Sequence, residues 1–246
     1  QMESMRDILV IGDGCMDVYT YCDTTRLAPE APVPVLDVHD IDEHPGMAMN
    51  VYENVNSFTT SCDYVTNDNW TDILKTRYVH TKSNQHFVRI DTGVIDERIN
   101  LEELELDTFQ TVIISDYDKG FLSEMDIACI CDKHPQVFLD TKKVLGSWAE
   151  KAKFIKINQH EYERSREYVD SHKNQVIKTL GGQGCEYRGK MYSVDKVEVL
   201  DVSGAGDTFI AALAHRYTRF PEIGKAIEFA NYCASQVVQM RGTSTL

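Results

Sequence analysis

The chain has 246 residues, enough for one substantial domain with its own core, and its shares of 42% apolar and 26% charged residues are those of a globular protein. A formal net charge of −14 argues against nucleic acid or an anionic membrane as the main partner, because both would repel an acidic surface. Seven scattered cysteines without a zinc-binding spacing predict reduced thiols in a cytoplasmic protein, and no apolar run reaches the length of a membrane-spanning helix.

The first apolar run, residues 7–13, ends in Gly12-Asp13 and predicts a buried parallel strand. Asp13 and Asp17 follow at its carboxyl end, where ligands bind in open α/β sheets. Buried carboxylates are costly unless they are paired, so these aspartates either meet a polar ligand or a cation, or they are loop and cap residues.

The next segments predict a small separate sheet. Residues 18–23 and 33–41 have the pattern of strands, and the prolines at 29, 32 and 34 confine these strands to an edge or to a small sheet. Residues 48–57 predict a helix, and residues 75–91 predict a hairpin that turns at 82–85.

Four more short apolar runs follow, each with a polar residue at its end or directly after it; they are residues 112–115, 137–140, 154–157 and 175–179. Ser123 and Asp126 form a capping-box pattern at the start of a helix over residues 123–132. Asn158 and Glu161 have the same spacing, which fits either a helix cap or the placement of a metal ion. The alternation of strands and helices predicts an α/β fold with a doubly wound, mostly parallel sheet and a small β lid.

The most specific stretch is residues 201–209, Asp-Val-Ser-Gly-Ala-Gly-Asp-Thr-Phe. Residues 196–200 alternate as a strand does, and apolar residues after the glycines recur at helical spacing. The amides of Gly204, Ala205 and Gly206 would then point out of a helix start, which attracts anions. Asp207 would repel a phosphate there unless it is the general base for a hydroxyl that attacks a phosphoryl group.

A simpler interpretation of this stretch is a tight turn with an acidic residue in the first helical turn. No Gly-Lys-Ser/Thr follows the glycines, so the stretch is not a Walker P-loop.

The full string at 201–209 resembles the C-terminal signature of the ribokinase-like (PfkB) carbohydrate kinases. Residues 12–19, 26–35 and 45–51 resemble the opening of the D-glycero-β-D-manno-heptose-7-phosphate kinase domain of ADP-heptose synthesis. The resemblance covers nearly the whole chain, with regions near 59–72 and 162–174 shortened. It implies one kinase domain over residues 1–246, with a lid at about 17–45 and the hairpin at 75–91.

By this resemblance, the protein is an ATP- and Mg²⁺-dependent kinase that phosphorylates a hydroxyl of a sugar or sugar phosphate, with a heptose phosphate favoured. Asp207 is implied as the base, and Gly204, Ala205 and Gly206 as the groups that stabilise the phosphoryl oxygens. The implied nucleotide contacts are Asn158, Glu161, Thr179, Gly181, Gly184 and Asn231, and Glu161 would hold Mg²⁺ through water. The implied substrate contacts are Asp17, Gly46, Asn50, Arg77, Asp116 and Lys119; Arg77 and Arg89 are candidates for a sugar phosphate or are exposed strand residues.

The lid of this family often pairs with that of a second subunit, which implies a homodimer. A monovalent cation near Asp201 is a further candidate cofactor. The sequence departs from the family at Gly46-Met47, where the family has Gly-Gly, and this leaves the identity of the sugar open. The alternative is a non-catalytic protein that binds a sugar nucleotide or a protein partner: the shortened regions favour it, and the intact Gly206, Asp207 and Glu161 oppose it.

Overall fold

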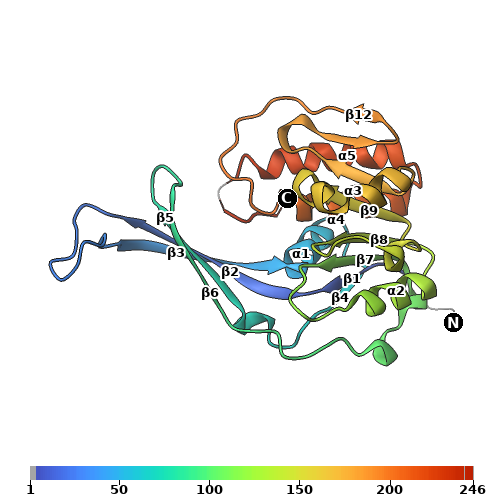
Figure 1. The fold of residues 1–246 in the computed structure, drawn as a ribbon, viewed down its shortest axis with the longest axis horizontal. Helices are drawn as coiled ribbons and strands as arrows, with labels where there is room; N and C mark the ends of the chain where they lie inside the picture. Colours follow the sequence, from blue (N-terminus) through green and yellow to red (C-terminus); the bar gives the residue numbers. More distant parts are fainter. Residues whose placement is uncertain (1–3, 241, 246) are drawn as a thin grey trace.

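The computed structural model describes residues 4–240 and 242–245. They form an eight-stranded main sheet with helices on both faces, and a four-stranded second sheet that projects from it as a lid (Figure 1). The predicted lid excursion corresponds to the second sheet, which the strands near 17–45 build together with the hairpin at 75–91.

The main sheet has the strand order β12-β11-β10-β9-β8-β7-β1-β4. Its strands are β1 (Arg6–Gly12), β4 (Cys62–Val65), β7 (Phe109–Asp116), β8 (Val137–Thr141), β9 (Phe154–Asn158), β10 (Val176–Thr179), β11 (Cys185–Tyr187) and β12 (Lys190–Tyr192). All pairs from β4 to β10 are parallel, and β11 and β12 extend one edge in antiparallel fashion. This confirms the predicted doubly wound, mostly parallel fold.

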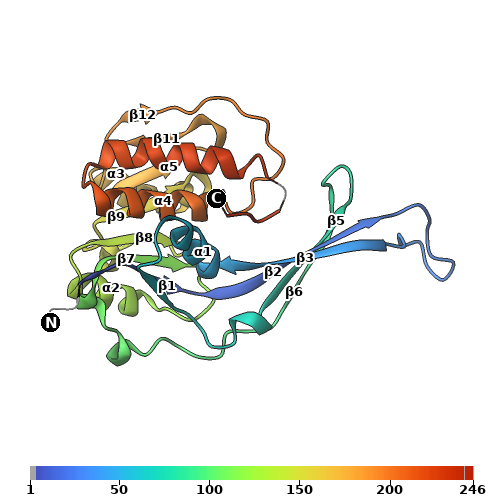
Figure 2. The ribbon, with the colours of Figure 1, turned by 180° about the vertical axis from the view of Figure 1, so that it is seen from behind.

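Helices cover both faces of this sheet. They are α1 (Ala48–Phe58), α2 (Glu124–Lys133), α3 (Gln159–Ser171), α4 (Ala205–Arg219) and α5 (Ile223–Val237), and short 3₁₀ turns span Trp70–Asp72, Leu101–Glu103, Leu106–Thr108, Ser147–Ala149 and Gly181–Gln183. Because side chains alternate along a strand, Ile8 and Val10 of β1 pack with α1, α4 and α5, whereas Leu9 and Ile11 pack with α2 and α3 (Figure 2). Within the described ranges, no helix has both the length and the apolar content to cross a bilayer.

The lid sheet has the order β3-β2-β5-β6 and consists of β2 (Gly14–Asp23), β3 (Asp37–Met47), β5 (Leu74–His80) and β6 (His86–Thr92). The hairpin of β5 and β6 confirms the prediction for residues 75–91. The predicted bounds of the other two strands were wrong, because β2 starts four residues earlier than expected and β3 runs from Asp37 to Met47 instead of over residues 33–41. Strands β2 and β3 stay paired down to the main sheet, where Gly14 lies opposite Met47. This pairing joins residues far apart in the sequence, so no local pattern could indicate it.

The two faces of the lid sheet differ in chemistry. Strand register puts Asp17, Lys75 and Asp91 in one row, and Tyr19, Arg77 and Arg89 in the next row of the same face. This face meets the main domain, because Tyr19 donates or accepts a hydrogen bond with Thr243, 2.7 Å between their hydroxyl oxygens. The opposite face carries exposed apolar side chains, among them those of Ile41, Val88 and Ile90.

The strand predicted over residues 196–200 is absent from the structure. The segment runs without regular secondary structure from β12 to α4, and the backbone N–H of Leu200 donates to the carbonyl oxygen of Val238 at the end of α5. The sheet already ends at β12, so this stretch has no neighbouring strand to pair with. Its alternating apolar residues serve another purpose, because Val197 and Val199 face a cavity above α5.

Met47 connects β3 to α1 in a backbone conformation that few non-glycine residues adopt. Its φ of 54° and ψ of −129° lie where only glycine is free of strain, which is a physical reason for the family's second glycine at this position. The Met47 side chain is buried in a small apolar cluster with Cys15 and Ile73, against which Tyr117 packs. Buried apolar contacts therefore offset the backbone strain.

We expect Met47→Gly to be more stable than Met47→Ala by about 1–2 kcal/mol in urea unfolding, because both lose the same side chain but only glycine relieves the strain. Met49, equally buried but inside α1, is the matched control. There the order should reverse, with Met49→Gly less stable than Met49→Ala by about 0.5–1 kcal/mol. The same order at both positions would show that Met47 stores no strain.

Candidate active site

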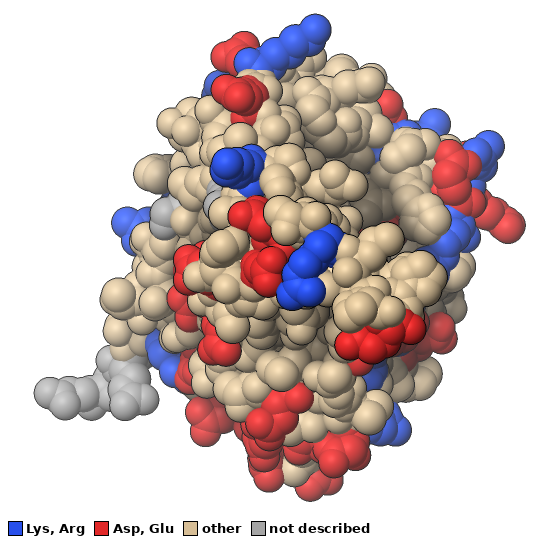
Figure 3. Space-filling model, turned by 90° about the vertical axis from the view of Figure 1, so that its left-hand side faces the viewer, with Lys and Arg blue, Asp and Glu red and all other residues tan. Residues whose placement is uncertain are grey.

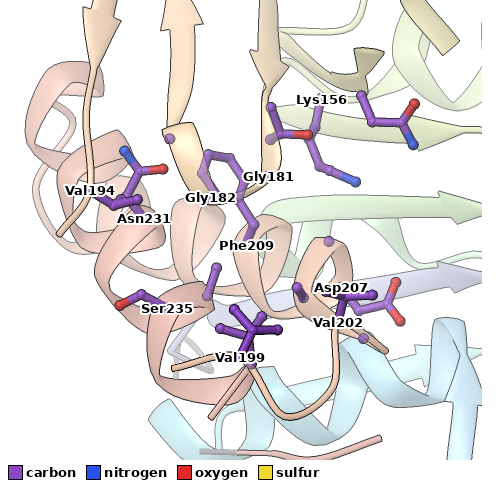
Figure 4. A pocket seen from close by; sticks show the side chains of 18 of the residues that line it. Lys156, Gly181, Gly182, Val194, Val199, Val202, Asp207, Phe209, Asn231 and Ser235 are labelled. Atoms are coloured by element: carbon purple, nitrogen blue, oxygen red, sulfur yellow. The ribbon is translucent and has the colours of Figure 1, made fainter. Parts of the chain in front are cut away.

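A cavity of about 530 Å³ opens at the carboxyl ends of the main-sheet strands, between the sheet and helices α4 and α5. Of the residues predicted to form the nucleotide and catalytic sites, it is lined by Asn158, Thr179, Gly181, Gly184, Gly204, Ala205, Gly206, Asp207 and Asn231. Lys156 and Asp207 lie at one end of the cavity, and Asn231 and Ser235 lie at the other (Figure 4). The whole lining runs from Tyr117 to Val238, so segments about half of the chain apart are brought to one place.

The charged end of the cavity is the start of α4. Gly204 caps the helix with a φ of 77°, a left-handed conformation that suits glycine, and the helix begins at Ala205. The expectation of three free amides needs a correction, because the N–H of Ala205 donates to the carbonyl oxygen of Val202 at 3.3 Å. The N–H of Gly206 has no partner among the described residues. A Cβ on Gly206 would lie 2.7 Å from Nζ of Lys156, so this ammonium group is directly beside the helix start.

Asp207 is a buried carboxylate with two hydrogen-bond donors. The hydroxyl of Tyr117 donates to its Oδ1 at 2.5 Å, and Nδ2 of Asn50 donates to its Oδ2 at 2.9 Å. Burial raises the pKa of Asp207 to about 6, and the bonds from Tyr117 and Asn50 oppose that rise. The carboxylate is therefore ionised at neutral pH yet only about one unit from taking up a proton, a suitable property for a general base.

Asn50 is fixed in its turn by α1 and α4. Nδ2 of Asn54, one turn further along α1, donates to the backbone carbonyl and to Oδ1 of Asn50 at 2.8 and 3.2 Å. The hydroxyl of Thr208 donates to Oδ1 of Asn54 at 3.0 Å, so the residue after Asp207 supports the same network. With its Oδ1 and backbone already engaged, Asn50 presents its amide nitrogen to Asp207.

Two lysines neutralise the carboxylates around this end of the cavity. Lys156 and Asp140 form an ion pair of 2.9 Å, and both side chains are almost completely buried. Lys142 pairs with Glu161 at 2.5 Å. Burial disfavours the charged form of Lys142, but the negative charges of Asp140 and Glu161 outweigh this effect and raise the pKa of Lys142. Oδ1 of Asp140 is buried without a hydrogen-bond partner among the described residues.

Asn158 and Glu161 have the geometry of a helix cap. Oδ1 of Asn158 accepts from the N–H of Glu161 at 2.8 Å, and Oε2 of Glu161 accepts from the N–H of Asn158 at 2.9 Å. Asn158 lines the cavity, but Glu161 is buried behind Lys142 and does not line it. The cap interpretation is therefore realised, while a role of Glu161 towards a metal ion stays a prediction.

The predicted substrate residues lie mostly on the lid side of Asp207. Oδ1 of Asp17 accepts from Nη1 of Arg77 at 2.9 Å, and Oδ2 accepts from the hydroxyl of Thr243 at 3.3 Å. A Cβ on Gly46 would lie 2.7 Å from Oδ2 of Asp17, so the glycine leaves room for that carboxylate. Lys119 is exposed in the loop after β7.

Asp116 does not reach the cavity. Its side chain is fully buried beneath the loop after β7, where it accepts from the hydroxyl of Thr141 at 2.5 Å and pairs with Lys143 at 3.1 Å. Asp13 is similarly buried, and its two oxygens accept from the backbone N–H groups of Tyr117 at 2.7 Å and Phe121 at 3.2 Å. These two aspartates hold the loop, and in this conformation neither is accessible to a sugar.

Sequence reasoning assigned no role in the site to Tyr117, Asp140 and Lys156. Tyr117 lies inside a segment that was singled out for its neighbours Asp116 and Lys119. A lysine in an otherwise apolar buried strand was a usable signal for Lys156, because such a charge requires a partner.

Comparison with known proteins agrees with this architecture. Residues 61–246 match the model of the pfkB family of carbohydrate kinases. The bifunctional protein HldE of Helicobacter pylori strain J99 is 32% identical over 297 aligned positions that include 98% of this chain and 64% of that protein. HldE of Vibrio vulnificus strain YJ016 is 31% identical, with 97% of this chain and 61% of that protein covered. The chain thus spans less than two thirds of these relatives, and the alignment is longer than the chain, which fits shortened interior regions.

Solved structures share the fold at low sequence identity. Ribokinase from Thermotoga maritima superposes with a TM-score of 0.75 at 16% identity, over 97% of this chain and 94% of that one. Arabidopsis thaliana ribokinase, solved with ribose and ATP, superposes with a TM-score of 0.69 at 17% identity, over 96% of this chain and 94% of that one.

Proposed function

The chain belongs to the pfkB family of carbohydrate kinases, and on that premise we propose that it transfers the γ-phosphoryl group of ATP to a hydroxyl group of a sugar phosphate. A heptose phosphate is the leading substrate, because HldE proteins are among its relatives and the N-terminal motifs resemble their kinase domain. The observation that carries the proposal is the position of Asp207, between the cavity and the charged face of the lid.

The chemistry follows from the groups around Asp207. Its carboxylate takes the proton of the acceptor hydroxyl as the new O–P bond forms, and the bond from the γ-phosphorus to the bridging oxygen breaks to release ADP. The N–H of Gly206 and the ammonium group of Lys156 stabilise negative charge on the transferred phosphoryl oxygens. Asn231 and Ser235, at the far end of the cavity, then lie on the side of the nucleotide base.

Asp140 of the cavity wall and the neighbouring Glu161 would suit a magnesium ion held mainly through water and the nucleotide phosphates, because no group of three metal-ligating side chains occurs among the described residues. The buried Oδ1 of Asp140 lacks a partner among the described residues, and Glu161 lies close by, paired with Lys142. A hard divalent cation takes such oxygens together with phosphate oxygens, and when bound it would neutralise charge on the nucleotide. Lys142 and Lys156 pair with the same carboxylates.

Positive charge at the base of the lid supports a phosphorylated acceptor. The surface seen from the lid end is crowded with Asp and Glu over its lower part (Figure 3), so an anionic substrate needs local cations. Nζ of Lys75 lies 5.4 Å from the centre of the Tyr117 ring, next to Asp207. Burial lowers the pKa of Lys75, and the positive charges of Arg89 and Lys119 lower it further. These three cations are the candidate phosphate cluster, in which Arg89 is also paired with Asp91 at 2.7 Å.

The exposed apolar face of the lid sheet supports a homodimer. Ile41, Val88 and Ile90 are 45–55% exposed on the face opposite the charged one. The edge strand β3 carries Asp37, Asp40 and Asp42, whose charges oppose edge-to-edge pairing. We therefore propose that the lid sheets of two copies pack face to face.

An ADP-release assay on a panel of sugars and sugar phosphates first finds a phosphorylated acceptor. On that acceptor, Asp207→Asn should reduce kcat roughly 10²–10⁴-fold, because the amide cannot take up the proton. The variant should fold, since its amide can still donate to the Tyr117 hydroxyl and accept from Asn50. Mass spectrometry of the product identifies the acceptor. Activity within about threefold of the parent would mean that the base lies elsewhere, and no transfer to any acceptor by the parent would favour a non-catalytic binding protein.

Lys119→Ala should raise KM for the phosphorylated acceptor about tenfold, because it removes one cation from the phosphate site. The KM for ATP should not change. Lys173→Ala, an equally exposed lysine outside the site, is the control. Equal effects on phosphorylated and unphosphorylated acceptors would contradict recognition of a phosphate by this cluster.

Light scattering at micromolar concentration should give twice the chain mass of 28.0 kDa. Ile90→Asp should yield the monomer, because it buries a carboxylate in the apolar lid contact. Val94→Asp, at a position that is 78% exposed outside the lid sheet, should leave the dimer intact. A monomeric parent protein would exclude the lid contact.

A further inference from the structure

Tyr117, to which no motif assigns a role, makes the shortest hydrogen bond to Asp207. The hydroxyl of Tyr117 is 2.5 Å from Oδ1 of Asp207, and both groups lie at the wall of the cavity. A short bond from a hydroxyl to a carboxylate is a strong, charge-assisted one. Asn50 binds the other oxygen, so the carboxylate cannot rotate without losing both donors.

We propose that Tyr117 is a positioning residue for catalysis, which clamps one oxygen of Asp207 while Asn50 clamps the other. The proposal rests on the proposed kinase function and deepens it. Each carboxylate oxygen has two lone pairs, so the clamp leaves one on each oxygen for the acceptor proton. The orientation of the Asp207 carboxylate is then fixed before the acceptor binds, so the activation free energy includes no entropic cost of ordering it.

Tyr117 is held both at its backbone and at its ring, as a clamp requires. Asp13 fixes its backbone N–H at 2.7 Å, and the ring packs against the apolar cluster of Met47. Nζ of Lys75 and Nζ of Lys142 lie 5.4 and 5.2 Å from the ring centre. These two ammonium groups near the ring make the Tyr117 hydroxyl a better hydrogen-bond donor to the Asp207 carboxylate.

The clamp also acts on the protonation of the base. Burial raises the pKa of Asp207, and the largest opposing contribution is the hydrogen bond from Tyr117. The pKa of Tyr117 itself is held well above its usual value by burial and by Asp207, so the hydroxyl remains a donor. The other ionisable groups that face Asp207 are Asp140 of β8, Lys142 of the loop after β8, Lys156 of β9 and Cys15 of β2. None of these is altered by removing the Tyr117 hydroxyl.

Tyr117→Phe tests the proposal, because it keeps the ring and removes only the hydroxyl. Loss of a hydrogen bond to the ionised form should move the acid limb of the kcat/KM profile up by about one to two pH units. Activity at pH 6 should therefore fall about five- to fiftyfold and recover as the pH rises. Tyr168→Phe, which removes a hydroxyl bonded to Gln175 far from the cavity, should leave the profile unchanged.

A second measurement needs no activity. Carbon-13 NMR of carboxyl-labelled aspartates should show one titration shifted to higher pH in Tyr117→Phe, and Asp207→Asn assigns that resonance by its absence. This shift in a protein without kinase activity would support the clamp and refute the proposed function. An unshifted titration would overturn the clamp. So would a higher kcat or a lower acceptor KM in Tyr117→Phe, since the hydroxyl would then merely occupy the place of the acceptor.

Discussion

The Asp207 carboxylate is buried at a helix start that also attracts anions, and the rest of the structure depends on how this negative charge is stabilised. Asp207 lies in the first turn of α4, beside the N–H of Gly206 and the ammonium group of Lys156. A buried carboxylate next to an anion site is stable only if its surroundings supply donors and cations. Tyr117, Asn50 and Lys156 meet this requirement, and each comes from a different part of the chain.

This arrangement explains why the strand ends carry paired charges. Asp140 requires Lys156, and Glu161 requires Lys142, because an unpaired charge at that depth would be costly. Asp13 and Asp116 stabilise the loop that presents Tyr117. The surroundings of the cavity are therefore one electrostatic network, in which the ends of β1, β7, β8 and β9 each contribute a carboxylate or its partner.

The sequence was informative where structure is local. The glycine turn, Asp207 and the start of α4 lie within a few residues of one another, so their relation could be predicted before any fold was known. The Asp140–Lys156 pair could not, because it joins neighbouring strands β8 and β9 and depends on their order and register. The prediction of a strand at 196–200 was wrong because it also depended on long-range pairing. Alternating apolar residues show only that every second side chain faces the same way, and the wall of a cavity produces that pattern as a sheet does. The early start of β2 and the late start of β3 likewise depend on pairing between distant segments.

The connectivity of the lid has a consequence for how the molecule assembles. β2 pairs in parallel with β5, and between them the chain passes through β3, α1 and β4, of which β4 is an edge strand of the main sheet. A parallel pair cannot be closed by a tight turn, so the connection from β2 to β5 runs through β4, which pairs with β1 of the main sheet. The β2–β3 and β5–β6 hairpins join neighbouring segments, whereas the β2–β5 pair joins segments separated by α1 and β4. The half of the site that faces the sugar thus depends on contacts between distant segments, which we expect to form later in folding than the two local hairpins.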